Sequence, residues 1–72
     1  MIRDDRELRV TQERIAYFER LLGQLRVTAR REEFPAVAGG YRAEIERMQA
    51  EVLDYLSRHA SEPTLERIPA AT

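Results

Sequence analysis

Apolar residues recur in two stretches of the chain, at alternating steps of three and four residues. The first stretch comprises Ile15, Phe18, Leu22, Leu25 and Ala29. The second comprises Ala38, Tyr41, Ile45, Met48, Val52, Tyr55 and His59. In a helix these steps place each set on one stripe, the seam of a coiled coil. The pattern predicts two amphipathic helices, and we find no alternation typical of a half-buried strand.

The first helix is predicted over residues 11–31. Thr11 is a suitable N-cap, because its hydroxyl can accept a hydrogen bond from a free backbone N–H of the first turn. Residues 1–10 would then form a charged arm. Leu8 lies seven residues before Ile15 and so continues the seam, which leaves an earlier start open.

Gly23 lies within this first predicted helix, where glycine costs about 1 kcal/mol relative to alanine. Two interpretations stay open. Either the glycine has no structural role and the helix tolerates its cost, or its lack of a side chain permits the close approach of another helix.

The second helix is predicted over residues 36–60. Pro35 interrupts the first helix and can serve as the first residue of the next one. A start after Gly40 is the alternative. Pro63 disfavours helical geometry in the residue before it, so residues 61–72 are expected to form a tail.

These elements predict an all-α fold, an antiparallel helical hairpin of two helices of about 20 residues. Each apolar stripe is wider than one hairpin can cover, so we expect two hairpins to pair as a homodimer in a four-helix bundle. The apolar residues expected at the shared interface are Ile15, Phe18, Leu21, Leu22, Leu25, Tyr41, Ile45, Met48, Val52, Leu53, Tyr55 and Leu56.

The amino-acid composition excludes several classes of function but adds little to the predicted fold. The chain has 72 residues, no cysteine, one histidine and a net charge of −1. Disulfides and zinc–thiolate sites are excluded, and a near-neutral chain argues against a dedicated nucleic-acid binder. No apolar run suits a membrane span, and the first residues are too charged for a signal peptide, so a cytoplasmic location is expected.

The charges are separated along the chain, and all 12 basic residues are arginine. Five arginines against two glutamates give residues 11–31 a net charge of +3, and three arginines against six acids give residues 32–60 a net charge of −3. We expect the two predicted helices to be electrostatically complementary. The basic helix also supports the alternative of a nucleic-acid-associated transcriptional regulator that uses Arg14, Arg20, Arg26, Arg30 and Arg31.

Few residues are candidates for chemistry. His59 could ligate a metal together with Tyr55 or Glu62, or respond to pH, but a lone histidine at a helix end is more simply explained by the helix dipole and partial packing. Tyr41 and Tyr55 on the seam are expected to pack in the core, with a partner-facing role as the alternative.

The charged cluster from Arg3 to Arg9 resembles an active-site group only in composition, because no apolar setting surrounds it. The sequence also has no phosphate-binding loop, nucleophile elbow or paired-carboxylate spacing. We therefore expect a non-enzymatic protein without a metal, a cofactor or a small-molecule substrate, whose function is to bind another protein.

The opening Ile2-Arg3-x-x-Arg6-Glu7-x-Arg9-Val10-Thr11, followed by Ile15-x-x-Phe18-Glu19-x-x-Leu22, resembles a helical segment of small bacterial proteins. Similar segments precede the helix-turn-helix domain of Xre-type regulators, including antitoxin-like ones. The later run Arg42-x-x-Ile45-x-x-Met48-x-x-Glu51-Val52-x-x-Tyr55 is similar to the second helix of that segment. Only residues 61–72 follow, so the resemblance implies a dimerisation or regulatory segment without DNA reading.

Overall fold

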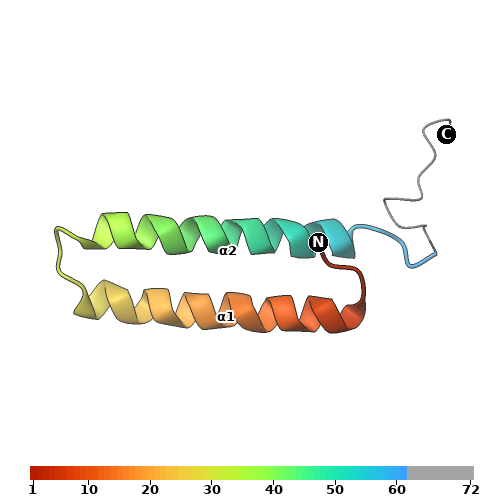
Figure 1. The fold of residues 1–72 in the computed structure, drawn as a ribbon, viewed down its shortest axis with the longest axis horizontal. Coiled ribbons are helices and arrows are strands. Elements are labelled where there is room, and N and C mark those ends of the chain that lie inside the picture. Colours follow the sequence, from red (N-terminus) through yellow and green to blue (C-terminus); the bar gives the residue numbers. More distant parts are fainter. Residues whose placement is uncertain (62–72) are drawn as a thin grey trace, which may run out of the picture.

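The protein is a hairpin of two long helices that lie side by side and run in opposite directions (Figure 1). The computed structural model describes residues 1–61. Helix α1 spans Asp5–Thr28 and helix α2 spans Phe34–Leu56, and no strand occurs in this range. The all-α hairpin predicted from the two seams is confirmed.

Helix α1 begins at Asp5, six residues before the predicted start. The N-cap is Asp4 rather than Thr11: a side-chain oxygen of Asp4 accepts from the backbone N–H of Glu7 at 2.8 Å. Glu7 in turn accepts from the backbone N–H of Arg3, also at 2.8 Å. The arm predicted over residues 1–10 is therefore wrong for residues 5–10, which are helical, and the earlier start indicated by Leu8 is correct.

A short turn connects the helices. Helix α1 ends at Thr28, three residues before the predicted end, and its C-cap Ala29 is extended. The Thr28 hydroxyl donates to the Gln24 carbonyl at 3.0 Å, a bond that competes with continued helix. The backbone N–H groups of Glu33 and Phe34 both donate to the carbonyl of Arg30, which closes the turn.

Helix α2 begins at Phe34 with Pro35 in its first turn, close to the first of the two predicted starts. The alternative start after Gly40 is wrong, since Gly40 lies inside the helix. The helix ends at Leu56, earlier than the predicted residue 60. Ser57 caps this end with its backbone N–H and its hydroxyl, which both donate to the carbonyl of Leu53. Of the tail predicted over residues 61–72, all but residue 61 lies outside the described residues.

Two cross-helix contacts set the register. The rings of Phe18 and Tyr41 lie 5.7 Å apart, and the hydroxyl of Tyr55 donates to Asp5 at 2.7 Å. Both contacts fit one antiparallel alignment, which brings Ile15 level with Ile45. Ile45 and Met48 are the two buried residues of the helices, so the core is thin and lies in the middle of the hairpin.

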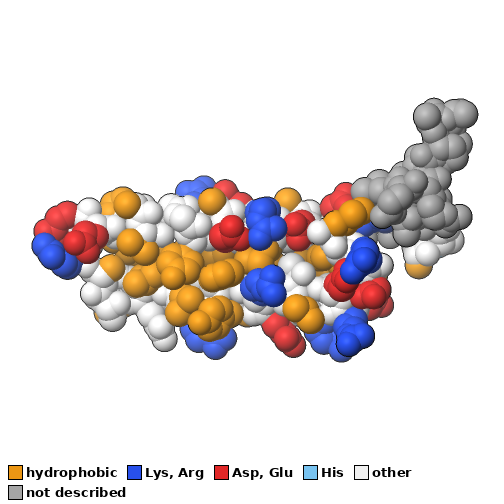
Figure 2. Space-filling model, viewed as in Figure 1, with side chains coloured by type: hydrophobic (Ala, Val, Ile, Leu, Met, Phe, Trp, Pro, Cys, Tyr) orange, Lys and Arg blue, Asp and Glu red, His pale blue; other side chains and the backbone are white. Residues whose placement is uncertain are grey.

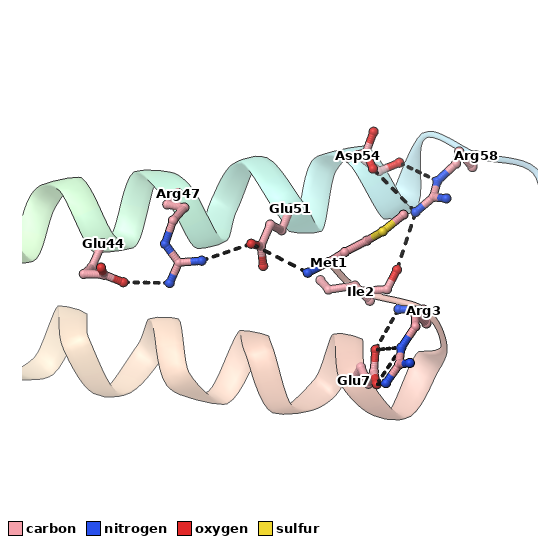
Figure 3. Close-up of polar contacts among 9 residues, drawn as sticks. All are labelled: Met1, Ile2, Arg3, Glu7, Glu44, Arg47, Glu51, Asp54 and Arg58. Atoms are coloured by element: carbon pink, nitrogen blue, oxygen red, sulfur yellow. Dashed lines mark hydrogen bonds and ion pairs between the residues drawn. The ribbon is translucent and has the colours of Figure 1, made fainter. Parts of the chain in front are cut away.

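The third buried residue comes from outside the helices. Ile2 is 3% exposed, because Met1, Ile2 and Arg3, here called the N-terminal clasp, fold back over the ends of both helices (Figure 3). Arg58 donates to the Ile2 carbonyl at 3.5 Å, and the Met1 amino group lies 3.9 Å from a carboxylate oxygen of Glu51. The clasp therefore ties the start of α1 to the last turns of α2.

Within residues 1–61, neither helix combines the length and the apolar character that a membrane span requires.

Candidate interaction surface

The structure divides the twelve predicted interface residues into three groups. Ile45 and Met48 are buried within the hairpin. Leu53 and Leu56 are exposed near the end of α2. The remaining eight are half-buried along the seam, where one hairpin covers only part of each side chain: Ile15, Phe18, Leu21, Leu22, Leu25, Tyr41, Val52 and Tyr55.

The hairpin has two broad faces, and they differ in character. Val10 and Arg14 of α1 and Arg47 and Glu51 of α2 line one shallow pocket together with the clasp, so they lie on the same side of the molecule. We call this side the clasp face. Helical spacing of three, four or seven residues places further residues on it: Tyr17 and Leu21 of α1, and Val37 and Glu44 of α2.

The clasp face is apolar toward the turn between the helices. The Tyr17 and Phe18 rings lie 5.8 Å apart, and Phe18 also meets Tyr41, so three aromatic rings run across the hairpin from α1 to α2. Tyr17 is 53% exposed. Figure 2 shows hydrophobic side chains gathered along the seam and over α1 in the half of the molecule nearer the turn. We call Tyr17, Phe18, Leu21, Leu25, Val37 and Tyr41 the aromatic patch.

The same face is charged toward the termini. Arg47 pairs with Glu44 at 2.7 Å and with Glu51 at 3.0 Å, and Glu51 also faces the Met1 amino group (Figure 3). Glu44 is the main reason that the pKa of Arg47 is raised. These groups form a line of alternating charge along α2, and each pair contributes little to stability because its members are solvated.

The opposite face is mostly polar. Positions seven residues apart on α1 there are Gln12, Glu19 and Arg26, and α2 contributes Glu46 and Gln49. Leu53 lies two residues from Glu51, which places it nearly opposite on the helix. The predicted interface residues therefore do not form one surface, since Leu53 and its neighbour Leu56 are separated from the aromatic patch.

The basic and the acidic helix are predicted to be electrostatically complementary, but this complementarity does not produce ion pairs between them. Within residues 1–61, no ion pair joins a side chain of α1 to a side chain of α2. Six of the seven pairs in this range join residues three or four apart in sequence, such as Arg42 with Glu46 at 2.9 Å and Arg58 with Asp54 at 3.5 Å. The reason is geometric: the seam that faces the other helix is apolar, and residues three or four apart on a helix are closer neighbours.

The arginines of α1 do not form one basic face. Arg14, Arg20 and Arg26 are six residues apart, so they project in three directions about 120° from one another. Arg20 stacks over the Tyr17 ring with its guanidinium carbon 6.0 Å from the ring centre. None of the three is ion-paired within the described part of the chain. Arg30 pairs with Glu33 in the turn at 3.6 Å.

The two candidate polar residues near the end of α2 are separated. The Tyr55 hydroxyl is held by Asp5, and this hydrogen bond, more than any other effect, raises the pKa of Tyr55. His59 lies beyond the helix end and is exposed, whereas the sequence predicted it in the last turn and partly packed. Its Nδ1 atom contacts the Ser61 hydroxyl at 2.8 Å. Glu62 lies outside the described residues, and residues 1–61 contain no cluster of three metal-binding side chains.

Two residues of structural importance were missed by the sequence interpretation. Ile2 belongs to the predicted charged arm but is buried in the fold. It is a single apolar residue followed by charged ones, so no periodic pattern marks it as a core residue. Asp4 was overlooked as the N-cap, although an acid three residues before Glu7 is a recognisable capping pattern that could have identified it.

Comparison of this chain with known protein families, with curated proteins and with solved structures finds no match in any of the three.

Proposed function

We propose that this protein is a non-enzymatic helical module that self-associates as a homodimer and, in that form, binds another protein. The fold is a two-helix hairpin, and two copies paired in a four-helix bundle would share the apolar surface that one copy leaves uncovered. A regulatory or antitoxin-like role, which the sequence resemblance implies, belongs to the same proposal.

The observation that carries the proposal is the mismatch between apolar side chains and burial. Ile2, Ile45 and Met48 alone are buried among residues 1–61, while Tyr17, Leu53 and Leu56 are more than half exposed. Domains of this size bury too little surface to be comfortably stable alone. Aromatic residues are also enriched in the cores of protein interfaces, and the aromatic patch contains three of them.

The alternative, a nucleic-acid-associated regulator, needs a continuous basic surface. The three directions taken by Arg14, Arg20 and Arg26 spread positive charge around α1 and do not concentrate it. We therefore place protein binding first.

Sedimentation velocity at micromolar concentrations tests the proposal. We expect a species of twice the chain mass that dissociates on dilution. Ile45→Asp is the matched core variant: an unpaired carboxylate at a buried position costs several kcal/mol, so helicity and association should both be lost. Ala50→Asp, at an exposed position on the same helix, should retain both. A wild-type chain that stays monomeric and cooperatively folded contradicts the proposal.

A further inference from the structure

We infer that the second copy packs on the clasp face, with the two-fold axis parallel to the helices and the two turns at the same end of the dimer. This inference rests on the proposed homodimer and adds which face is shared and how the copies are oriented. Two properties of the clasp face carry it: its apolar and aromatic side chains gather mainly toward the turn, with Met1 and Val10 as the exposed apolar residues toward the termini, and its two helices carry different charges.

The first property is the uneven distribution along the face. The aromatic patch occupies the half near the turn, and the Glu44–Arg47–Glu51 line with the clasp occupies the half near the termini. A two-fold axis parallel to the helices brings the turn-side halves of the two copies together, so the aromatic patch of one copy meets the aromatic patch of the other. An axis perpendicular to the helices at the middle of the face would cover apolar side chains with charged ones, which leaves the charged groups desolvated and poorly paired.

The second property is charge complementarity between the helices of different copies. With the axis parallel to the helices, α1 of one copy lies over α2 of the other, and all neighbouring helices are antiparallel. The register of the hairpin puts Arg14 level with the stretch that contains Glu44 and Ile45. Arg14 has no carboxylate partner within residues 1–61, so it meets Glu44 of the second copy. With the perpendicular axis, α1 would lie over α1, and Arg14 would lie against the clasp-face side chains of another α1, such as Tyr17 and Leu21, and not against Glu44.

The opposite face is the competing surface, and its composition disfavours it. Leu53 and Leu56 are exposed there, but helical spacing of four and seven residues places the polar Gln49 and Glu46 on the same stripe as Leu53. An interface needs a contiguous apolar centre with a polar rim, an arrangement that the aromatic patch provides with Arg14 and Arg20 at its edge.

Distance measurements between paired spin labels test the orientation. The chain has no cysteine, so Glu32→Cys in the turn gives one label per copy. Parallel packing keeps the two labels within one bundle width, about 20–25 Å. A perpendicular axis separates them by about the length of α2, roughly 35 Å at 1.5 Å per residue. A dimer whose labels are separated by the longer distance overturns the orientation and leaves the proposed homodimer intact.

Two aspartate variants test the face. Tyr17→Asp places a charge in the aromatic patch at an exposed position, and we expect the dimer dissociation constant to rise at least about tenfold, with monomer helicity retained in circular dichroism. Leu53→Asp is the matched control on the opposite face and should leave the dissociation constant unchanged. The reverse result overturns the inference, and a wild-type chain that is monomeric overturns both this inference and the proposed function.

Charge reversal gives a second test that leaves the hairpin core untouched. Arg14→Glu should weaken dimerisation by about two- to fivefold, the range of an exposed ion pair. Glu44→Arg combined with Arg14→Glu should restore part of the affinity, because the pair is rebuilt with the opposite sense. If the double variant is as weak as the sum of the single ones, Arg14 does not face Glu44 and the proposed arrangement is wrong.

Discussion

Single residues at the helix ends connect parts of this chain that are far apart in sequence. The Tyr55 hydroxyl donates to Asp5 across fifty positions, and Arg58 reaches the Ile2 carbonyl. Arg3 binds Glu7 with its backbone N–H and its guanidinium group, and these hydrogen bonds lower the pKa of Glu7. Because these groups are solvated, they fix the register and orientation of the ends more than they add stability.

The Tyr55–Asp5 hydrogen bond makes the fold sensitive to high pH. Folding raises the pKa of Tyr55 above its ordinary value of 10.0, because the phenolic O–H donates a hydrogen bond to the Asp5 carboxylate. The folded state therefore holds this proton more tightly than the unfolded state. The hydrogen bond stabilises the hairpin fully below the ordinary pKa, and its contribution is lost as the pH rises through the raised pKa.

An absorbance titration of the three tyrosines checks this expectation. In Asp5→Ala, which removes the acceptor, one tyrosine should ionise at a lower pH than in the wild-type chain, and Tyr55→Phe should remove that titrating group. A wild-type curve that matches that of Asp5→Ala would show that the hydrogen bond does not persist in solution.

At the scale of the elements, local capping determines where each helix begins and ends. Asp4 starts α1, and the Ser57 hydroxyl and backbone end α2. The three glycines lie inside the helices, and a Cβ at any of them would meet no atom within 4 Å. Within one hairpin, the close approach considered for Gly23 is therefore absent, and the glycine only weakens the helix.

Gly23→Ala should stabilise the protein. Alanine is favoured over glycine in a helix interior by about 1 kcal/mol, and the side chain has free space. For a domain of this size we expect the melting temperature to rise by about 4–8 °C. Ala16→Gly is the matched control at an exposed position of the same helix, and it should lower the melting temperature by a similar amount. An unchanged or lower melting temperature for Gly23→Ala would mean that another helix approaches it in the assembled protein.

At the scale of the whole molecule, the hairpin is held together by a thin core and a clasp. Ile45 and Met48 lie between the helices, and Ile2 covers the end of the same core from a segment outside both helices. The N-terminal clasp is therefore a third packing element beside the two helices that residues 1–61 form.

Ile2→Ala tests this role of the clasp. Removing most of a buried isoleucine side chain costs about 2–5 kcal/mol, which is a large share of the stability of a small domain. Urea unfolding followed by circular dichroism should show a marked loss. Val10→Ala, at a half-exposed position on α1, should change the free energy of unfolding by less than about 0.5 kcal/mol. Equal effects of the two substitutions would mean that the clasp does not pack in solution.

The sequence by itself determined the fold class, the number of helices and the seam of each one, because a repeat of three and four apolar positions fits a helix and no other regular structure. Ile15, Phe18, Tyr41, Ile45 and Met48 were all placed on the correct stripe. Capping was less certain, since both Asp4 and Thr11 are competent N-caps and only the packing of Ile2 and Asp5 at the end of α2 favours the earlier one.

Only the tertiary structure decided which apolar residues are covered and which remain accessible. Periodicity places Leu53 near the seam, but burial depends on what lies opposite, and within residues 1–61 no element covers that side of α2. Likewise, net charges of +3 and −3 suggest pairing between the helices, while the ion pairs in residues 1–61 mainly join residues three or four apart in sequence. Burial and pairing are set by distances across the fold, and a one-dimensional pattern does not contain them.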